Sequence, residues 1–382
     1  MNRKVVVLGA TGSIGRQAIE VARGLDLEIA AVAARRPSSE LAALANEFPD
    51  ALVAVAGGSG EERISFGASV GNHLEFGGEA VTRAASISNC TVVNGIVGAA
   101  GLRATVAALE TGNRLALANK ESLVAGGPVV LKTLDEHGGE LIPVDSEHSA
   151  LYQCLTGENR AEVARLVLTA SGGPFRGRTR EDLAGVTTEE ALAHPTWDMG
   201  PRISIDSATL FNKGLEVIEA HHLFGIDYDR IDVVVHPQSI LHSAVEFIDG
   251  SWKGHFGYPD MRIPIQYALT APGRMESNLG PFQLAGRDLT FEEPDRAVFP
   301  AIDLAFEAGR KGGSAPAVLN AADEVAVAAF LQGRLEFLGI ADVVERTLDK
   351  VAWRELAGVD DVLEVDREAR SVAATLIPGA YC

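Results

Sequence analysis

The stretch that decides the fold is Lys4-Val5-Val6-Val7-Leu8-Gly9-Ala10-Thr11-Gly12-Ser13-Ile14-Gly15. Its first five residues form an apolar, mostly β-branched run, which predicts a buried strand. Residues 16–23 follow the glycines with a helical pattern that places Ile19 and Ala22 on the apolar side. A second apolar run at residues 27–33 predicts the next strand. The sequence therefore predicts a strand–helix–strand unit at the start of an α/β domain.

The three glycines between the first strand and the helix have the spacing GxxGxxG, whereas the standard dinucleotide fingerprint is GxGxxG. The physical reason for them is the same. Glycines let the backbone approach a pyrophosphate closely, and the helix N-terminus supplies N–H groups and the positive end of a dipole. We therefore predict dinucleotide binding here. The alternative is a tight turn that binds nothing.

The residues after the second strand discriminate between NAD and NADP. An acidic residue at this point would bind the ribose hydroxyls of NAD. The chain has Arg35 and Arg36 instead, and two guanidinium groups suit a 2′-phosphate through charge-assisted contacts. This pair favours NADPH as the cofactor; the alternative is two solvated surface arginines.

The remaining chain predicts a change of architecture near residue 145. Strand and helix patterns alternate up to that point, which predicts a parallel, doubly wound, Rossmann-like sheet. Later patterns mix strands with loops, and helical periodicity dominates the C-terminal part. We predict an NADPH-binding domain at 1–145, an α+β catalytic domain with metal, phosphate and lid segments at 146–270, a linker at 271–300 and a small helical domain at 301–382.

Composition limits the partners and the compartment. The chain has 382 residues, 47% of them hydrophobic, and a formal net charge of −19. This charge argues against nucleic acid or an anionic membrane as the main partner. The three cysteines, Cys90, Cys154 and Cys382, form no disulfide framework. There is no signal sequence or membrane-spanning run, so we expect a cytoplasmic enzyme.

Two acidic clusters about seventy residues apart predict a metal site. The first is 143–148, with Asp145 and Glu147. If it continued a strand, these two carboxylates would share one face beyond the strand's carboxyl end. The second is 207–216, with Glu216 in a helical pattern. Three carboxylates without a set of Cys or His ligands favour Mg²⁺ or Mn²⁺. The alternative for any single one is a solvated surface acid.

Other segments predict a phosphate site and a lid. Residues 171–173, Ser-Gly-Gly after a strand, can form a backbone nest for an anion. Ser207 lies where a helix N-cap is expected, and Asn212 and Lys213 add donors. An exposed Trp197 in the Pro/Gly-rich loop 194–201 predicts a lid over a ligand. A plain turn, a plain N-cap and a core-anchoring Trp are the alternatives.

Taken together, the ordered motifs resemble the 1-deoxy-D-xylulose 5-phosphate reductoisomerase family. The resemblance covers essentially the whole chain and rests on residues 9–15, 96–102, 116–124, 144–148, 171–175, 194–200, 206–216, 236–242 and 319–324. It implies rearrangement of 1-deoxy-D-xylulose 5-phosphate and NADPH-dependent reduction to 2-C-methyl-D-erythritol 4-phosphate, a step of isoprenoid precursor synthesis. It also implies a homodimer.

The resemblance implies roles residue by residue. The metal ligands would be Asp145, Glu147 and Glu216. The phosphate would be held by Ser171, Ser207, Asn212 and Lys213. Groups that contact the sugar or act in catalysis would be Lys120, Ser146, Glu147 and His194, with Trp197 and Met199 in the lid. The cofactor contacts would be Thr11, Gly12, Ser13, Ile14, Asn119, Glu121 and Gly200. Arg35 and Arg36 are cofactor residues on separate grounds, because their guanidinium groups suit the 2′-phosphate of NADPH.

The sequence departs from the family at two points. Ala34-Arg35-Arg36 stands where Gly-x-Asn is more common, and Phe211 stands where Met is more usual. Two other functions fit the sequence less well. A simple NADPH-dependent reductase of an aldehyde phosphate would not need three carboxylates with a phosphate cluster. A nucleotide-sensing protein would keep residues 9–15 and have no use for the acidic clusters.

Overall fold

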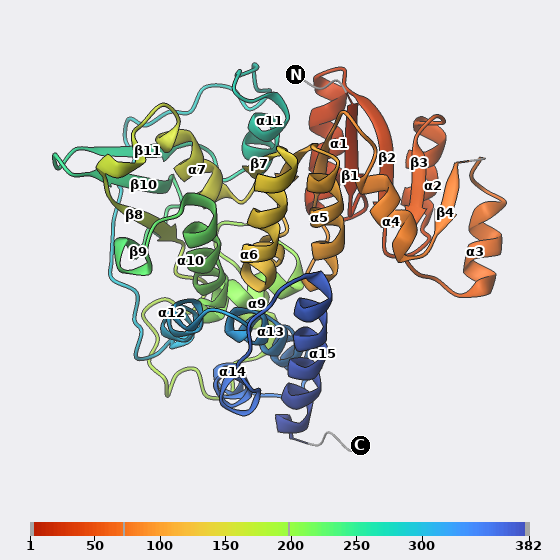
Figure 1. The fold of residues 1–382 in the computed structure, drawn as a ribbon. Coiled ribbons are helices and arrows are strands. Elements are labelled where there is room, and N and C mark those ends of the chain that lie inside the picture. The colour runs from red at the N-terminus through yellow and green to blue at the C-terminus, as the bar shows by residue number, and fades with distance from the viewer. Residues whose placement is uncertain (1–3, 72, 198, 379–382) are drawn as a thin grey trace. The chain divides into compact units, whose positions relative to one another are not determined.

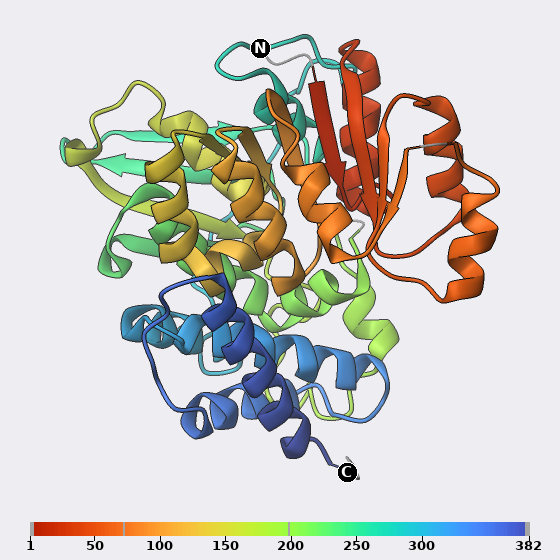
Figure 2. The ribbon, with the colours of Figure 1, turned by 45° about the vertical axis from the view of Figure 1, so that its right-hand side comes forward.

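The computed structural model describes residues 4–71, 73–197 and 199–378. These residues form two compact units, and the chain passes between them several times (Figures 1 and 2). The first unit contains the residues up to 122, then 130–149 and 260–280. The second contains 123–129, 150–259 and the residues from 281 onward. None of the helices in the described ranges is long and apolar enough to cross a membrane.

A parallel sheet forms the centre of the first unit. Over the described residues it has seven strands in the order β4-β3-β2-β1-β5-β6-β7, and every neighbouring pair is parallel. The strands are β1 (Lys4–Leu8), β2 (Glu28–Ala34), β3 (Leu52–Val55), β4 (Leu74–Phe76), β5 (Cys90–Asn94), β6 (Arg114–Leu117) and β7 (Glu140–Pro143). The apolar residues of β1 are buried because helices cover both faces of such a sheet.

The helices of the first unit connect these strands or pack against them. They are α1 (Ser13–Gly24), α2 (Ser39–Glu47), α3 (Gly60–Gly67), α4 (Gly78–Ala85), the 3₁₀ turn η1 (Ala99–Gly101), α5 (Leu102–Glu110), α6 (Lys120–His137) and α11 (Arg262–Thr270). Helix α11, distant in sequence, packs against α1, β6 and β7. Helix α6 has a break at Gly126, with Pro128 two residues later, and its residues 123–129 belong to the second unit.

The second unit is built on a smaller mixed sheet. Its described strands have the order β11-β10-β8-β9, in which only β8 and β9 are parallel. They are β8 (Val163–Ala170), β9 (Ile231–Val235), β10 (Leu241–Phe247) and β11 (Trp252–Phe256). One continuous hydrophobic core joins this sheet to helix α10 and to the C-terminal helices, through side chains such as Phe211, Phe306 and Phe330.

The helices of the second unit include a C-terminal bundle, the blue ribbons of Figure 1. They are α8 (Thr188–Leu192), α9 (Pro201–Thr209), α10 (Phe211–Phe224), α12 (Ala301–Lys311), α13 (Ala315–Leu331), α14 (Gly339–Lys350) and α15 (Val359–Leu376), with 3₁₀ turns η2 (Arg160–Glu162) and η3 (Tyr228–Arg230) and with α7 (Ser146–Leu155) shared by both units. Alanine-rich α13 packs against both α14 and α15, and small side chains allow this close packing. The predicted fold class, a Rossmann-like sheet with an α+β part and C-terminal helices, is confirmed.

Candidate active site

The glycine loop lies where the order of strands in the parallel sheet reverses. Successive strands are added outward from β1 on one side and from β5 on the other. Gly9 follows β1 with φ +80°, and a Cβ there would lie 2.7 Å from the carbonyl oxygen of Gly95 after β5. A Cβ on Gly15 would lie 2.2 Å from the carbonyl oxygen of Gly9. Two of the glycines are therefore explained by close backbone contacts at the crevice where open α/β sheets bind ligands.

A pocket lies beside this loop at the end of β2. Its volume is about 440 Å³, and Thr11, Arg35, Arg36, Pro37 and Ser38 line it. Both arginines are exposed, as are Gly12 and Ser13 in the glycine loop. The two arginines predicted to select NADPH thus line the same pocket as Thr11 of the glycine loop.

Asn119 and Glu121 hold the loop that follows β5. The Asn119 side-chain amide donates to the carbonyl oxygens of Ile96, at 2.6 Å, and Gly98, at 3.0 Å, and to the Glu121 carboxylate at 2.8 Å. Glu121 accepts a hydrogen bond from the Gly98 N–H at 3.1 Å. Both side chains are buried. These two predicted cofactor residues therefore shape a loop at the same crevice.

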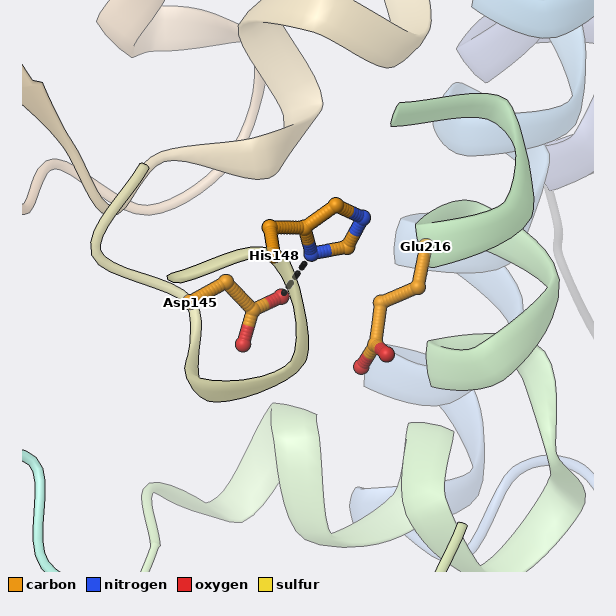
Figure 3. A group of neighbouring side chains, drawn as sticks. All are labelled: Asp145, His148 and Glu216. Atoms are coloured by element: carbon orange, nitrogen blue, oxygen red, sulfur yellow. Dashed lines mark ion pairs between the residues drawn. The ribbon is translucent and has the colours of Figure 1, made fainter. Parts of the chain in front are cut away.

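Asp145 lies between two cationic or potentially cationic groups of the first unit. Its carboxylate is 2.5 Å from the Lys120 ammonium and 3.5 Å from Nδ1 of His148, the pair drawn with a dashed line in Figure 3. Burial alone would raise the pKa of the Asp145 carboxyl, but Lys120 and His148 hold it well below its ordinary value. Asp145 is therefore an anion at neutral pH, although it is largely removed from solvent.

The predicted strand geometry of this acidic cluster is wrong. Strand β7 ends at Pro143, and helix α7 begins at Ser146. Glu147 therefore lies in the first turn of a helix, where residues two apart point to different sides. Its carboxylate accepts a hydrogen bond from the Ser146 hydroxyl, so these two predicted residues are in direct contact.

Glu216 is fully buried in α10 and is held by its own helix. It accepts a hydrogen bond from the Asn212 amide at 2.5 Å and forms an ion pair with Lys213. The Lys213 side chain is also buried. Figure 3 shows the Glu216 carboxylate at the end of an extended side chain from this helix. Both Asn212 and Lys213 were predicted to bind phosphate, and here they contact the predicted metal ligand.

The phosphate-binding candidates Ser171 and Ser207 lie in adjoining segments. A Cβ on Gly173 would lie 2.8 Å from the carbonyl oxygen of Ser207, so the Ser-Gly-Gly turn packs directly on that backbone. The expected N-cap role of Ser207 is wrong. Ser207 belongs to the last turn of α9, and Leu210, with φ +64°, separates α9 from α10.

His194 organises the predicted lid segment, residues 194–201. The backbone N–H groups of Thr196 and Trp197 both donate to its Nδ1, at 3.2 and 2.9 Å. The neutral ring therefore carries its proton on Nε2, which is 2.9 Å from the Ser171 hydroxyl. Burial lowers the pKa of the His194 imidazole, which favours this neutral form.

Trp197 is half-buried, so the expectation of an exposed side chain is wrong. Its ring centroid lies 6.3 Å from that of His242 in β10. Met199 is also half-buried, Gly200 is the N-cap of α9, and Asp198 of the predicted lid motif lies outside the described residues. The lid role of Trp197 remains a prediction.

A buried charge cluster was not predicted from the sequence. Arg202 contacts Asp206 at 3.5 Å in its own helix, and Asp323 at 3.5 Å and Glu324 at 3.2 Å in α13. Arg370 of α15 contacts Glu324 at 2.7 Å. The cluster ties α9, which begins at the end of the predicted lid segment, to the C-terminal helices. Asp323 and Glu324 belong to the sequence motif at residues 319–324, but their partners are too distant in sequence to infer.

Three protein-family models match successive parts of the chain. Residues 5–127 match 1-deoxy-D-xylulose 5-phosphate reductoisomerase, residues 141–224 match its C-terminal domain, and residues 256–372 match a DXP reductoisomerase C-terminal domain. The chain belongs to the 1-deoxy-D-xylulose 5-phosphate reductoisomerase family. Each model covers segments that carry the predicted motifs.

Individual members of the family agree over nearly the full length. The 1-deoxy-D-xylulose 5-phosphate reductoisomerase of Pelotomaculum thermopropionicum is 47% identical, with 98% of each chain covered. That of Xanthomonas axonopodis pv. citri is 49% identical, covering 97% of this chain and 96% of the relative. The solved structure of the Zymomonas mobilis enzyme in complex with NADPH has a TM-score of 0.91 at 43% identity, covering 99% of this chain and 100% of that one. A reductoisomerase structure in complex with NADPH, fosmidomycin and magnesium has a TM-score of 0.89 at 37% identity, with 98% of each chain covered.

Proposed function

We propose that the chain converts 1-deoxy-D-xylulose 5-phosphate to 2-C-methyl-D-erythritol 4-phosphate, with NADPH and a divalent cation. The observation that carries this proposal is membership of the reductoisomerase family over almost the entire chain. The solved relatives that contain NADPH and magnesium support both cofactors. A simple reductase would have no need for the acidic groups around Asp145 and Glu216.

The first unit fits NADPH through its glycine loop and its arginines. Gly9 and Gly15 allow the close backbone contacts of the turn at the crevice, and the first turn of α1 presents backbone N–H groups that suit a pyrophosphate. We assign the pyrophosphate contacts to residues 11–14 and the 2′-phosphate contacts to Arg35 and Arg36. Asn119 and Glu121 would act at the other end of the cofactor, and Gly200 would contact it from the segment before α9.

The donor set fits a hard divalent cation. Carboxylate oxygens of Asp145, Glu147 and Glu216 would hold it, and the imidazole of His148 offers a further ligand atom. The buried Glu216 carboxylate, balanced here by Lys213, is suited to receive a cation. When bound, the cation polarises the substrate carbonyl and its adjacent hydroxyl, and NADPH supplies the hydride.

The remaining residues would bind and enclose the sugar phosphate. We assign the phosphate to Ser171, Ser207, Asn212 and Lys213, which combine hydroxyl and amide donors with an ammonium group. Lys120, Ser146 and His194 would contact the sugar portion. In this arrangement the His194 Nε2–H is oriented toward Ser171. Trp197 and Met199 would cover the substrate and exclude water from an aldehyde.

Two further proposals, on location and on oligomeric state, accompany the function. We propose a cytoplasmic location, supported by the free, buried thiols of Cys90 and Cys154, which suit a reducing compartment. We also propose a homodimer, as the resemblance to the family implies. Light scattering coupled to gel filtration measures this oligomeric state directly.

The deciding experiment is oxidation of NADPH with 1-deoxy-D-xylulose 5-phosphate, with and without Mg²⁺ or Mn²⁺. Identification of the product separates rearrangement with reduction from reduction alone. Glu216→Gln should lower turnover by orders of magnitude while NADPH still binds. Glu219→Gln, one turn further along α10 and equally buried, is the matched control. Near-normal activity of Glu216→Gln at limiting Mn²⁺ would contradict the metal assignment.

A further inference from the structure

A buried chain of hydrogen bonds runs through the first unit behind the loop that follows β5. The Asn94 amide donates to the Thr105 hydroxyl at 2.8 Å, and that hydroxyl donates to the Ser122 hydroxyl at 3.1 Å. Ser122 in turn donates to the side-chain oxygen of Asn119. Asn94, Thr105 and Ser122 are all completely buried. The four side chains come from β5, α5, α6 and the residue before α6.

The direction of these bonds determines how the Asn119 amide is turned. Because the Ser122 hydroxyl donates to the oxygen of that amide, the NH₂ group must face the other way. It does so, and donates to the carbonyl oxygens of Ile96 and Gly98. With the amide reversed, its oxygen would face those two carbonyl oxygens and both bonds would be lost.

The loop held in this way lies at the crevice of the sheet. Gly95, its first residue, is the backbone that approaches Gly9 of the glycine loop. Val97 projects from it and is 68% exposed, although it is apolar. In an open parallel sheet, the loop after the strand across the switch point faces the ligand. A dinucleotide whose pyrophosphate lies on the glycine loop would bring its nicotinamide half toward this second loop.

We propose that Thr105 and Ser122 are positioning residues: their hydroxyls orient Asn119, which fixes the 95–98 loop for the nicotinamide half of NADPH. This inference rests on the proposed use of NADPH. Neither hydroxyl touches the cofactor in this scheme, and both act through Asn119.

The test uses Ser122→Ala and Thr105→Val in the full chain, with Thr105→Ser as the variant that retains the hydroxyl. Thr91→Val is the matched control, because the Thr91 hydroxyl is buried in β5 and has no hydrogen-bond partner among the described residues. Binding of NADPH is compared with binding of 2′-phospho-ADP-ribose, which lacks the nicotinamide. Thermal unfolding of every variant is measured alongside.

We expect Ser122→Ala and Thr105→Val to weaken NADPH binding by roughly three- to tenfold, the net value of about one hydrogen bond. Their affinity for 2′-phospho-ADP-ribose should stay at the wild-type value, and Thr105→Ser should restore NADPH binding. If the two hydroxyls had a purely structural role, the substitutions would weaken the binding of both ligands equally or of neither. Equal weakening of both ligands, or unchanged NADPH affinity in both variants, would overturn the proposal.

Hydrogen–deuterium exchange separates this inference from the proposed function. In the free protein, the amides of Ile96 and Gly98 are hydrogen-bonded to Asn94 and Glu121. Ser122→Ala should speed their exchange relative to Thr91→Val. If wild-type protein failed to bind NADPH, the proposed function would fall, while the exchange rates would still decide the role of the two hydroxyls. Unchanged exchange in Ser122→Ala would remove that role.

Discussion

Replacing Arg35 and Arg36 by Ser should convert the chain from selective NADPH binding toward equal binding of NADPH and NADH. The two guanidinium groups line the pocket at the end of β2, beside Thr11 of the glycine loop. An NAD-binding site would carry an acidic side chain there, and such a side chain would repel a 2′-phosphate. NADH lacks this phosphate, so its affinity should change little.

The size of the effect follows from the exposure of both arginines. A hydrogen bond to a charged group contributes about 1.5–3 kcal/mol, and exposed pairs lie at the lower end because water competes. About 1.5 kcal/mol corresponds to roughly a tenfold change in the dissociation constant. Because the two residues are adjacent and would share one phosphate, their effects are not independent. We expect the double variant to bind NADPH between about tenfold and a hundredfold more weakly.

The assay is fluorescence titration of the reduced cofactor with wild type, both single variants and the double variant. Arg83→Ser is a matched control, because Arg83 is an exposed arginine of the same unit that is paired with Glu75 on α4 and β4. It should leave both cofactors unaffected. Equal affinity of the wild type for NADH and NADPH, or equally weakened binding of both cofactors by the double variant, would refute this role of the two arginines.

Three other substitutions or titrations test separate parts of the structure. Gly15→Ala should destabilise the protein by about 1–3 kcal/mol in denaturant unfolding, because the new methyl group overlaps a backbone carbonyl. The control is Gly24→Ala in the same helix, whose methyl group meets nothing within 4 Å and which should be neutral or stabilising. An NMR titration of His194 should give a midpoint below the ordinary pKa of 6.5, because burial disfavours the charged ring. The stability from the neutral ring is present above pH 6.5 and is lost as the pH falls through the lower folded pKa, so a midpoint at or above 6.5 would contradict the lowered pKa. Trp197→Ala should lower turnover or raise KM with little change in Tm, and a large fall in Tm with unchanged kinetics would make this residue a core anchor instead.

The charge cluster around Asp323 should make stability depend on pH in the opposite direction to His194, so that stability falls as the pH rises. Burial and the nearby Asp206 raise the pKa of the Asp323 carboxyl well above its ordinary 3.8, although Arg202 opposes them, and Glu324 adds to the rise. The folded state therefore keeps a proton that the unfolded chain releases above 3.8, and stability falls as the pH rises toward the folded pKa. Asp323→Asn should lose this dependence, so its Tm relative to wild type should increase with pH; a constant difference would contradict the shift.

The sequence predicts best where the signal is local. The strand at 4–8, the glycine turn and the first helix are contiguous, so one stretch contains all the information. Strands β3 and β4 were not predicted, because four and three residues are too few to show a periodicity. The chemistry of the side chains predicts the metal and phosphate residues, but it does not predict their local geometry.

The predicted local structures at Asp145 and at Ser207 were wrong for physical reasons. At Asp145 the chain leaves the strand immediately, and the Asp145 carboxylate accepts from the Ser146 N–H at 3.0 Å as α7 begins. Asp and Ser are frequent at such positions, so this signal was present in the sequence. At Ser207 no signal was available, because the two helices are divided by Leu210 in a left-handed conformation that leucine rarely adopts. The hydrogen bonds of Thr105 and Ser122 depend on the pairing of β5 with β6, which no local pattern encodes.

The repeated crossing of the chain between the two units limits how the protein can be divided. The nucleotide-binding sheet depends on α11 from residues 260–280, and the second unit takes residues 123–129 from the middle of α6. A fragment that stops near residue 150 would leave the apolar surface beneath α11 bare, and the remaining fragment would lack a piece of its core. Neither half is therefore a transferable module, and gene fusions, circular permutants or split versions of this enzyme need their breakpoints in exposed loops within a unit.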